Sequence, residues 1–223
     1  MIELRDITRV FNAGRTSEFT AIRGVSLHVP RGQVTALVGP SGSGKTTLLS
    51  IMGAMSRPST GRVWVGGREI TSLPERFLTM VRRETFGFIF QQFNLVRGLS
   101  ALENAMLPAY PTGEPWARIR GRALSLFEQF SMADKAHDKV QWLSGGQAQR
   151  VAVIRALINN PPVIIADEPT ANLDSALSEQ LMDTLGQLNA EGRTIIITSH
   201  DPAVYGSSVV HNAFTMHDGR LAG

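Results

Sequence analysis

The 223-residue sequence contains no cysteine. This absence excludes a disulfide scaffold and a cysteine-ligated zinc site, and it is consistent with a reducing compartment. Lysine is also scarce, because arginine supplies most of the basic side chains. The arginines are scattered apart from small groups at Arg82–Arg83 and Arg118–Arg122. Since the formal net charge is only +3, we expect a mixed, solvated surface and no nucleic-acid partner.

Long apolar runs are missing as well. The longest, VIIA at 163–166 and TIIIT at 194–198, have the length of single strands, whereas a bilayer span needs about 18 consecutive apolar residues. The opening residues, MIELRDITRV, lack the basic-then-apolar order of a signal peptide. We therefore expect a soluble chain in the cytoplasm, and any membrane span that it serves would come from another polypeptide.

Most of the sequence alternates strand and helix patterns. Short apolar segments are followed by helical patterns in both 1–91 and 161–223, which favours a parallel sheet with helices on both faces. Between about 92 and 160 no strand pattern occurs. The sequence therefore predicts a single α/β domain over 1–223, with a core at 1–91 and 161–223 and an inserted helical subdomain at about 92–160.

Two helices can be placed within that subdomain. One begins at a capping box, in which Ser100 is followed three residues later by Glu103. The other covers EPWARIRGRALSLFEQF, at 114–130. Its apolar residues recur at helical spacing and predict one apolar stripe, formed by Trp116, Ile119, Ala123, Leu126 and Phe127.

The most specific motif is GPSGSGKTT, which matches the phosphate-binding pattern G-x-x-x-x-G-K-[ST]. It lies between an apolar strand and a helix, which disfavours an accidental glycine-serine turn. The glycines let the backbone N–H groups face inward, and the helix start adds a positive dipole end. We expect Lys45 to reach the β- and γ-phosphates of ATP, and the Thr46 hydroxyl to suit Mg²⁺. The predicted ATP-binding residues of this loop are Gly39, Pro40, Ser41, Gly42, Ser43, Gly44, Lys45, Thr46 and Thr47.

Two acidic residues follow the apolar strand VIIA, at a position where open α/β sheets bind ligands. Asp167 is expected to hold Mg²⁺ through water, and Glu168 to orient or deprotonate the water that attacks the γ-phosphate. Taken alone, such a pair is more typical of a helix cap or a turn. Beside a phosphate loop, a catalytic role is favoured.

Two further polar residues follow strand patterns. His200 ends TIIITSH and can donate a hydrogen bond to a γ-phosphate oxygen, although an ordinary loop histidine fits the same pattern. Gln91 follows FGFIF, where the core gives way to the helical subdomain, and its neutral amide can contact Mg²⁺ or the attacking water. We therefore predict that Glu168, His200 and Gln91 are catalytic and that Thr46, Gln91 and Asp167 bind the metal.

The segment LSGGQAQR, at 143–150, begins another predicted helix. Ser144 can cap it and Gln147 can complete a capping box. A plain cap does not explain Gly145 and Gly146, because each glycine costs up to about 1 kcal/mol in a helix relative to alanine. Close approach of an anion does explain them. Since the helical subdomain keeps this turn away from its own phosphate loop, we predict a twofold dimer that sandwiches two ATP molecules.

These motifs stand in the order found in ATP-binding subunits of ABC transporters, which the chain resembles over essentially its whole length. GPSGSGKT is similar to the Walker A motif, Gln91 to the Q-loop, LSGGQ to the signature, VIIADE to the Walker B motif, ANLD with Asp174 to the D-loop, and His200 to the switch histidine. The resemblance implies a P-loop NTPase (RecA-like) core with an antiparallel β-subdomain and an inserted α-helical subdomain. It also implies Glu168 as the catalytic base, ATP contacts from Phe11 and Asp174, and a transmembrane permease as partner at the cytoplasmic face of the membrane.

The chain departs from the family pattern at three places. Phe11 stands where a tyrosine commonly stacks on adenine, so the stacking face remains without the hydroxyl. Ala148 stands where glutamine is usual, and KVQW before the signature lacks a common proline. The last two lie near the helical subdomain, so they bear on partner docking more than on ATP chemistry.

The branch of the family is indicated by RRETFGFIFQQFNL, LSALENAMLP and DEPTANLD, which look most like subunits for lipoprotein release and macrolide export. This predicts export of a lipid-linked or hydrophobic substrate. FQQFNL also occurs in amino-acid importers, so an importer ATPase is an alternative. A soluble ABC ATPase of DNA repair, chromosome maintenance or translation is a further alternative, but such proteins carry coiled coils, zinc modules or tandem cassettes. A small-molecule P-loop kinase would leave LSGGQ and His200 without a role.

Overall fold

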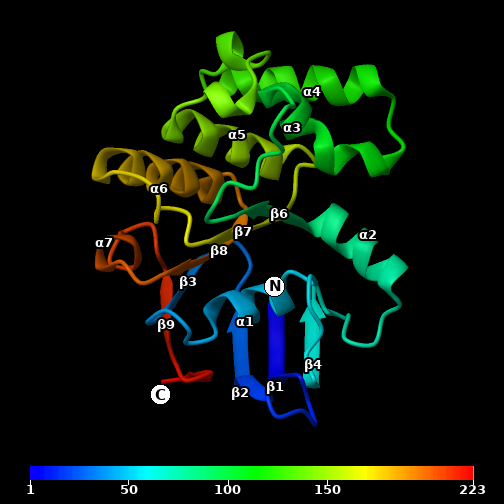
Figure 1. Ribbon diagram of the computed structural model, residues 1–223, viewed down its shortest axis with the longest axis vertical. Coiled ribbons are helices and arrows are strands. Elements are labelled where there is room, and N and C mark those ends of the chain that lie inside the picture. The colour runs from blue at the N-terminus through cyan, green and yellow to red at the C-terminus, as the bar shows by residue number, and fades with distance from the viewer. Residues whose placement is uncertain (223) are drawn as a thin grey trace.

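The computed structural model describes residues 1–222, which form two sheets and a group of helices set beyond them (Figure 1). The first sheet is antiparallel, with the strand order β2-β1-β4-β5. Its strands are β1 (Ile2–Phe11), β2 (Phe19–Val29), β4 (Thr60–Val65) and β5 (Arg68–Glu69). This sheet confirms the antiparallel β-subdomain that the family resemblance implies.

The second sheet has the order β10-β9-β3-β8-β7-β6, in which all pairs except β10 with β9 are parallel. Its strands are β3 (Val34–Val38), β6 (Phe86–Ile89), β7 (Val163–Asp167), β8 (Thr194–Ser199), β9 (Asn212–His217) and β10 (Arg220–Leu221). The carboxyl ends of the parallel strands therefore meet at one edge of the sheet, where loops that follow β3, β6, β7 and β8 lie close together.

Side-chain alternation gives this central sheet two buried faces. Ile165 and Ile196 belong to a core shared with the antiparallel sheet and with α1 (Lys45–Met52). Ile164 and Ile195 point the other way, into a core shared with α6 (Ser175–Ala190). The prediction of a parallel sheet covered on both faces is confirmed.

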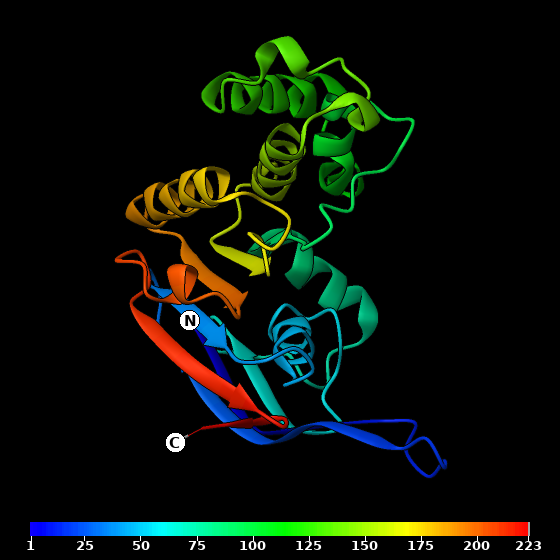
Figure 2. The same ribbon diagram turned by 60° about the vertical axis from the view of Figure 1, so that its left-hand side comes forward.

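The segment 92–160 contains helices and one isolated bridge, between Ser100 and Lys139, within the described chain. Figure 2 shows this group to one side of the sheets. Its helices are α3 (Ala101–Met106), η1 (Leu107–Thr112), α4 (Trp116–Gln129), η2 (Ala133–Lys135), η3 (Val140–Trp142) and α5 (Gly145–Leu157). The α3 capping box of Ser100 and Glu103 is present as predicted.

Helix α5 joins the two parts of the molecule. Val151 and Ile154 pack in the core of the helical group, whereas Val153 and Leu157 pack against the central sheet. One helix therefore contributes to both cores and links the helical group to the sheet. The remaining helices are α2 (Glu75–Thr85) and α7 (Pro202–Tyr205).

The predicted apolar stripe on α4 is buried over only part of its length. Ile119, Ala123 and Phe127 are buried, but Trp116 has 61% of its surface exposed. It is the first residue of the helix and lies outside the helical core, with the guanidinium of Arg120 5.7 Å from its ring centre.

Within residues 1–222 no helix combines the length and apolar character needed to cross a bilayer.

Candidate nucleotide-binding and hydrolysis site

The phosphate loop, Gly39–Thr46, connects β3 to α1. Its backbone requires glycine at the first position, because Gly39 has a φ of 149° and an added Cβ would lie 2.2 Å from the carbonyl oxygen of Met216. Helix α1 begins after Gly44 without a side-chain cap and without an acidic residue in its first turn. The free N–H groups and the helix dipole therefore favour an anion at this point.

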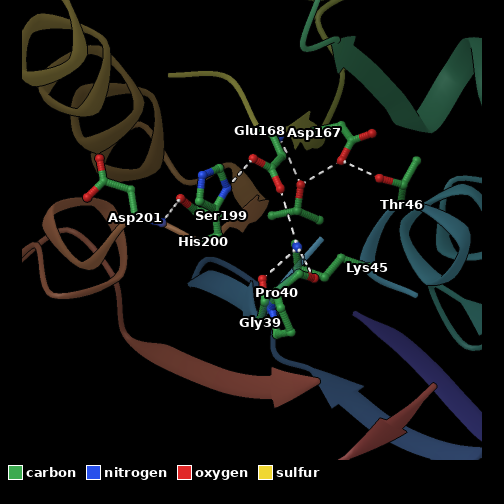
Figure 3. Close-up of polar contacts among 10 residues, drawn as sticks. Gly39, Pro40, Lys45, Thr46, Asp167, Glu168, Ser199, His200 and Asp201 are labelled. Carbon is green, nitrogen blue, oxygen red and sulfur yellow. Dashed lines mark hydrogen bonds and ion pairs between the residues drawn. The ribbon is translucent and has the colours of Figure 1, made fainter. Parts of the chain in front are cut away.

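Lys45 lies under this loop with only 4% of its side chain exposed. Its ammonium donates to the carbonyl oxygens of Gly39 (2.7 Å) and Pro40 (3.1 Å) and lies 3.3 Å from Oε1 of Glu168 (Figure 3). A buried ammonium needs such partners to offset its lost hydration. The same positive charge lies where incoming phosphate oxygens can compete for it.

Asp167 ends β7 and faces the start of α1. Its Oδ1 accepts hydrogen bonds from the hydroxyls of Thr46 (3.0 Å) and Thr198 (2.6 Å). Thr198 stands beside Asp167 in the parallel register of β7 and β8, and its hydroxyl also accepts a hydrogen bond from the Glu168 N–H (2.8 Å). One buried threonine therefore fixes both acidic residues, which was not predicted from the sequence.

Glu168 and His200 lie beside each other at the same edge (Figure 3). His200 Nδ1 is 2.6 Å from Glu168 Oε2, so the carboxylate is held between an imidazole and the ammonium of Lys45. Glu168 also adopts a left-handed φ of 44°, which is unusual for a residue with a side chain. The two neighbouring groups orient the carboxylate toward the loop, where it can accept a proton.

These groups line an open cleft of about 380 Å³. Gln91 belongs to it, and the carbonyl of Gln91 accepts a hydrogen bond from the side chain of Asn172 (2.7 Å). Ser43 instead is buried under the loop, and its hydroxyl has no hydrogen-bond partner among residues 1–222. The predicted site residues in the lining are Ser41, Gly42, Gly44, Lys45, Thr46, Thr47, Gln91, Glu168 and His200.

One aromatic ring lines the cleft, and a second is paired with it across the strands β1 and β2. Phe11, at the end of β1, is 38% exposed and has the Arg9 guanidinium 4.6 Å from its ring centre. Phe19 pairs directly opposite Phe11 in the β1–β2 register, is 56% exposed, and lines the cleft itself. Sequence reasoning identified only Phe11, because the pairing of the two strands sets the position of Phe19. Both rings can offer a face to a purine base.

The signature turn, Leu143–Gln147, lies elsewhere. Ser144 and Gln147 form the predicted capping box at the start of α5, with reciprocal bonds of 2.9 Å and 3.3 Å. A Cβ added at Gly145 would meet nothing within 4 Å. A Cβ added at Gly146 would lie 2.8 Å from the side chain of Leu177. Gly146 therefore has a packing reason within the chain, and only Gly145 leaves its outer side free.

Asp174 is also separate from the cleft. Its side chain caps α6 by accepting a hydrogen bond from the N–H of Leu177 (2.8 Å). Neither Asp174 nor any residue of 144–147 lines the phosphate cleft. The described chain thus brings together the phosphate loop, the two acids, Gln91 and His200, and it leaves the signature turn and Asp174 apart.

A phosphate loop that joins a parallel strand to a helix, with a carboxylate pair at the end of a neighbouring strand, defines a P-loop ATPase. Comparison with known proteins identifies the family: the family model described as ABC transporter matches residues 22–171, and the chain belongs to that family. It is an ATP-binding and ATP-hydrolysing cassette, as the sequence predicts.

Curated relatives are of two sizes. The chain is 43% identical over 221 residues to the "Macrolide export ATP-binding/permease protein MacB" of Hyphomonas neptunium, and it spans 34% of the length of that protein. It is 39% identical over 225 residues to an "Uncharacterized ABC transporter ATP-binding protein" of Thermotoga maritima, and there the match covers 94% of the relative.

Solved structures give the same fold. The dimeric bacterial ABC transporter cassette MJ0796 matches all of this chain with a TM-score of 0.91 and 38% identity, over 97% of its own length. A post-hydrolysis state of the same cassette, bound to ADP and Pi, matches with a TM-score of 0.90 and 37% identity.

Proposed function

We propose that this chain powers a separate transmembrane permease that exports a hydrophobic or lipid-linked compound. In this proposal it acts at the cytoplasmic face of the membrane, as two copies that enclose two ATP molecules. Support for export comes from the 43% identity with a macrolide export ATP-binding/permease protein. Support for a separate permease comes from the Thermotoga relative, which consists of little beyond the matched cassette.

ATP binding would begin at the phosphate loop. The uncapped N–H groups of the first turn of α1 would donate hydrogen bonds to phosphate oxygens, and the ammonium of Lys45 would turn from Glu168 to the β- and γ-phosphate oxygens. The carboxylate of Glu168 then becomes free to face water. Phe11 and Phe19 would hold the base, with the Arg9 guanidinium supporting the ring of Phe11.

The donor atoms at the end of β7 fit Mg²⁺. Thr46 Oγ1 and Asp167 Oδ1 are hard oxygen donors that lie 3.0 Å apart next to the phosphate loop, and Gln91 offers an amide oxygen in the same cleft. These three residues would hold the ion together with phosphate oxygens. When bound, Mg²⁺ would neutralise charge on the β- and γ-phosphates.

Hydrolysis would use Glu168 as the base. Its carboxylate accepts a proton from the water whose oxygen attacks the γ-phosphorus, the bond to the bridging oxygen breaks, and ADP and phosphate leave. His200, 2.6 Å from Glu168, keeps the carboxylate in place and can donate to a γ-phosphate oxygen. Thr198 fixes the backbone of Glu168 and the carboxylate of Asp167 together.

The other half of each site would come from a second copy. The signature turn does not line its own cleft, and its exposed Ser144 and Gly145 offer a hydroxyl and an unobstructed backbone to an anion. A twofold arrangement lets each copy place this turn on the phosphates held by the other. The similarity to a cassette solved as a dimer supports this arrangement.

The permease would dock on the exposed apolar side chains between Phe93 and Trp116. Val96, Tyr110 and Trp116 are large, apolar and exposed, and all three lie in or beside the helical subdomain. Together with the ATP cleft of the core, these exposed apolar side chains are the observation that supports the proposal, because they lie on the part of the chain that follows Gln91 and could bind another protein.

To test the function, a photo-crosslinking amino acid is placed at Trp116 in cells, and the same is done at Met55, an exposed residue of the core, as the control. We expect a crosslink from position 116 to an integral membrane protein, which stimulates ATP hydrolysis when reconstituted with this chain in vesicles. Equal crosslinking from both positions, or ATP hydrolysis stimulated only by DNA, would contradict the transport function.

A further inference from the structure

Arg155 lies in the last turn of α5 and is a buried cation with no acidic partner. Only 8% of its surface is exposed, and no carboxylate oxygen lies within 4.0 Å of its guanidinium in residues 1–222. Burial lowers the pKa of the guanidinium, though it stays protonated. A buried charge destabilises the fold unless its N–H groups make hydrogen bonds, so the acceptors of these N–H groups indicate what Arg155 holds in place.

Those partners are two consecutive backbone carbonyls next to Gln91. Arg155 Nη1 donates to the oxygen of Asn94 (2.6 Å), and Nη2 donates to the oxygen of Phe93 (2.7 Å). Phe90 precedes Gln91 in the sequence, and its ring centre lies 5.7 Å from the Arg155 guanidinium. The planar fork of arginine matches two neighbouring oxygens at once, whereas a lysine ammonium does not impose that geometry.

The segment held in this way is conformationally unusual. Phe93 and Asn94 have left-handed φ values of 56° and 50°, which residues with side chains rarely adopt in succession. The surrounding bonds must hold such a backbone in place. Besides Arg155, the segment is held by the Asn172 side chain on the carbonyl of Gln91 and by two local backbone bonds, from the Phe93 N–H to the Phe90 oxygen and from the Asn94 N–H to the Gln92 oxygen. Removal of the arginine fork would take away the two side-chain hydrogen bonds that join this segment to α5.

Arg155 also connects two parts of the proposed nucleotide site. Ser144 caps the start of α5, and Arg155 lies in its last turn, roughly 16 Å further along at the usual helical rise. A displacement of the signature turn would thus be carried along one rigid helix to the backbone beside Gln91. No other side chain of α5 bonds to the 91–94 segment within the described chain.

We propose that Arg155 is a positioning residue for ATP hydrolysis: it fixes Gln91 relative to the signature helix, so that the two move together when ATP binds. This inference rests on the proposed roles of Gln91 and Ser144. It concerns only the chain and its ATP, so the permease crosslinking experiment described above tests the transport function independently.

The test is a double-mutant cycle of Arg155→Lys with Gln91→Ala, measured as steady-state ATP hydrolysis by the full chain. Arg155→Lys alone is expected to lower kcat about tenfold to a hundredfold and to change KM for ATP less than about twofold, because the phosphate loop is untouched. In the Gln91→Ala background the same substitution should change kcat less than about twofold, because its effect acts through Gln91.

Arg83→Lys is the matched control, because Arg83 also donates to a backbone carbonyl in the helical subdomain, that of Pro111 (2.6 Å). It should leave kcat within about twofold of the wild type. Amide hydrogen exchange provides a readout that general destabilisation would not mimic. In Arg155→Lys the amides of Phe93 and Asn94 should exchange faster, while the amides within α5 remain protected.

Three results would overturn the proposal. The first is an equal loss of kcat from Arg155→Lys with and without Gln91→Ala. The second is accelerated exchange spread over all of α3, α4 and α5, which would mean that the arginine only stabilises the fold. The third is full activity of Arg155→Lys or of Gln91→Ala. If Arg155→Lys fails to fold, Arg155→Met takes its place, because it removes the unpaired buried charge.

Discussion

The phosphate cleft and the signature turn are both predicted to contact ATP, yet the chain builds them differently. At the cleft, the phosphate loop with Lys45 and the adjacent acids Asp167 and Glu168 come from segments far apart in the sequence and are joined through hydrogen bonds and an ion pair. At the signature turn, the side chains of Ser144 and Gln147 each accept a hydrogen bond only from the backbone N–H of the other residue. The cleft is therefore organised before ATP binds, whereas the signature turn is a capped helix start that needs a ligand from outside the chain.

The largest effect is expected at the acid of the cleft. Glu168→Gln removes the base but keeps the size of the side chain, so hydrolysis should fall about 10²- to 10⁴-fold while ATP still binds. Phosphate release measures the rate, and size-exclusion chromatography with Mg-ATP should show an accumulated dimer. Glu179→Gln, at an exposed position of α6, is the control. Hydrolysis at the wild-type rate by Glu168→Gln would remove Glu168 from the mechanism.

A smaller effect is expected from the threonine that links the two acids. Thr198→Val removes the bond to Asp167 and leaves the Glu168 N–H without its partner, which should cost about 1–3 kcal/mol of stability. Misplacement of Glu168 should lower kcat about tenfold or more.

The chain supplies a matched control for this change. Thr35 is equally buried, in β3, and its hydroxyl has no hydrogen-bond partner among residues 1–222. Thr35→Val should therefore be neutral or slightly stabilising in a denaturant titration. Equal behaviour of the two variants would show that the Thr198 hydroxyl does not organise the site.

The two glycines of the signature turn should respond differently to substitution by alanine. Gly146→Ala should destabilise the fold by about 1–3 kcal/mol, because the new methyl group overlaps Leu177, and Leu177→Ala should partly restore it. Gly145→Ala has open space and should raise the free energy of unfolding by up to about 1 kcal/mol. In the Glu168→Gln background, Gly145→Ala should nevertheless weaken the ATP-dependent dimer. A dimer of unchanged affinity would mean that no anion approaches this backbone.

The smallest effect concerns the helical subdomain alone. The Ser100 backbone and hydroxyl donate to Glu103 at 2.6 Å and 2.7 Å, and these bonds lower the pKa of the Glu103 carboxyl from 4.5. Because the folded pKa is the lower one, the stabilisation is present above pH 4.5 and is lost as pH falls through the folded pKa. In thermal melts, the wild type should have a higher Tm than Glu103→Gln at pH 7, and the two Tm values should converge at pH 3. A difference in Tm that is the same at both pH values would contradict this linkage.

The sequence predicted the fold because its signals are local. Strand ends that carry Asp167 and His200, and capping boxes at Ser100 and Ser144, can be recognised from neighbouring residues, and the structure confirms the fold class and both boxes. The roles of the site residues stay predictions, although nine of them line one cleft.

What the sequence did not reveal depends on pairing. Phe19 reaches the cleft because β2 pairs with β1, and Thr198 meets Asp167 because β8 lies beside β7. The packing reason for Gly146 is Leu177, far along the chain. The exposure of Trp116 was not evident either, because helical spacing does not show where a core ends.

The central claim is that the signature turn of one copy completes the ATP site of another. Since the chain has no cysteine, Ser41→Cys and Ser144→Cys introduce thiols only at the cleft lining and at the signature turn. Copies carrying one substitution each are mixed in the Glu168→Gln background and oxidised. The account predicts a disulfide-linked dimer that forms with Mg-ATP and not without nucleotide. No crosslink with Mg-ATP, or the same yield in its absence, would contradict it.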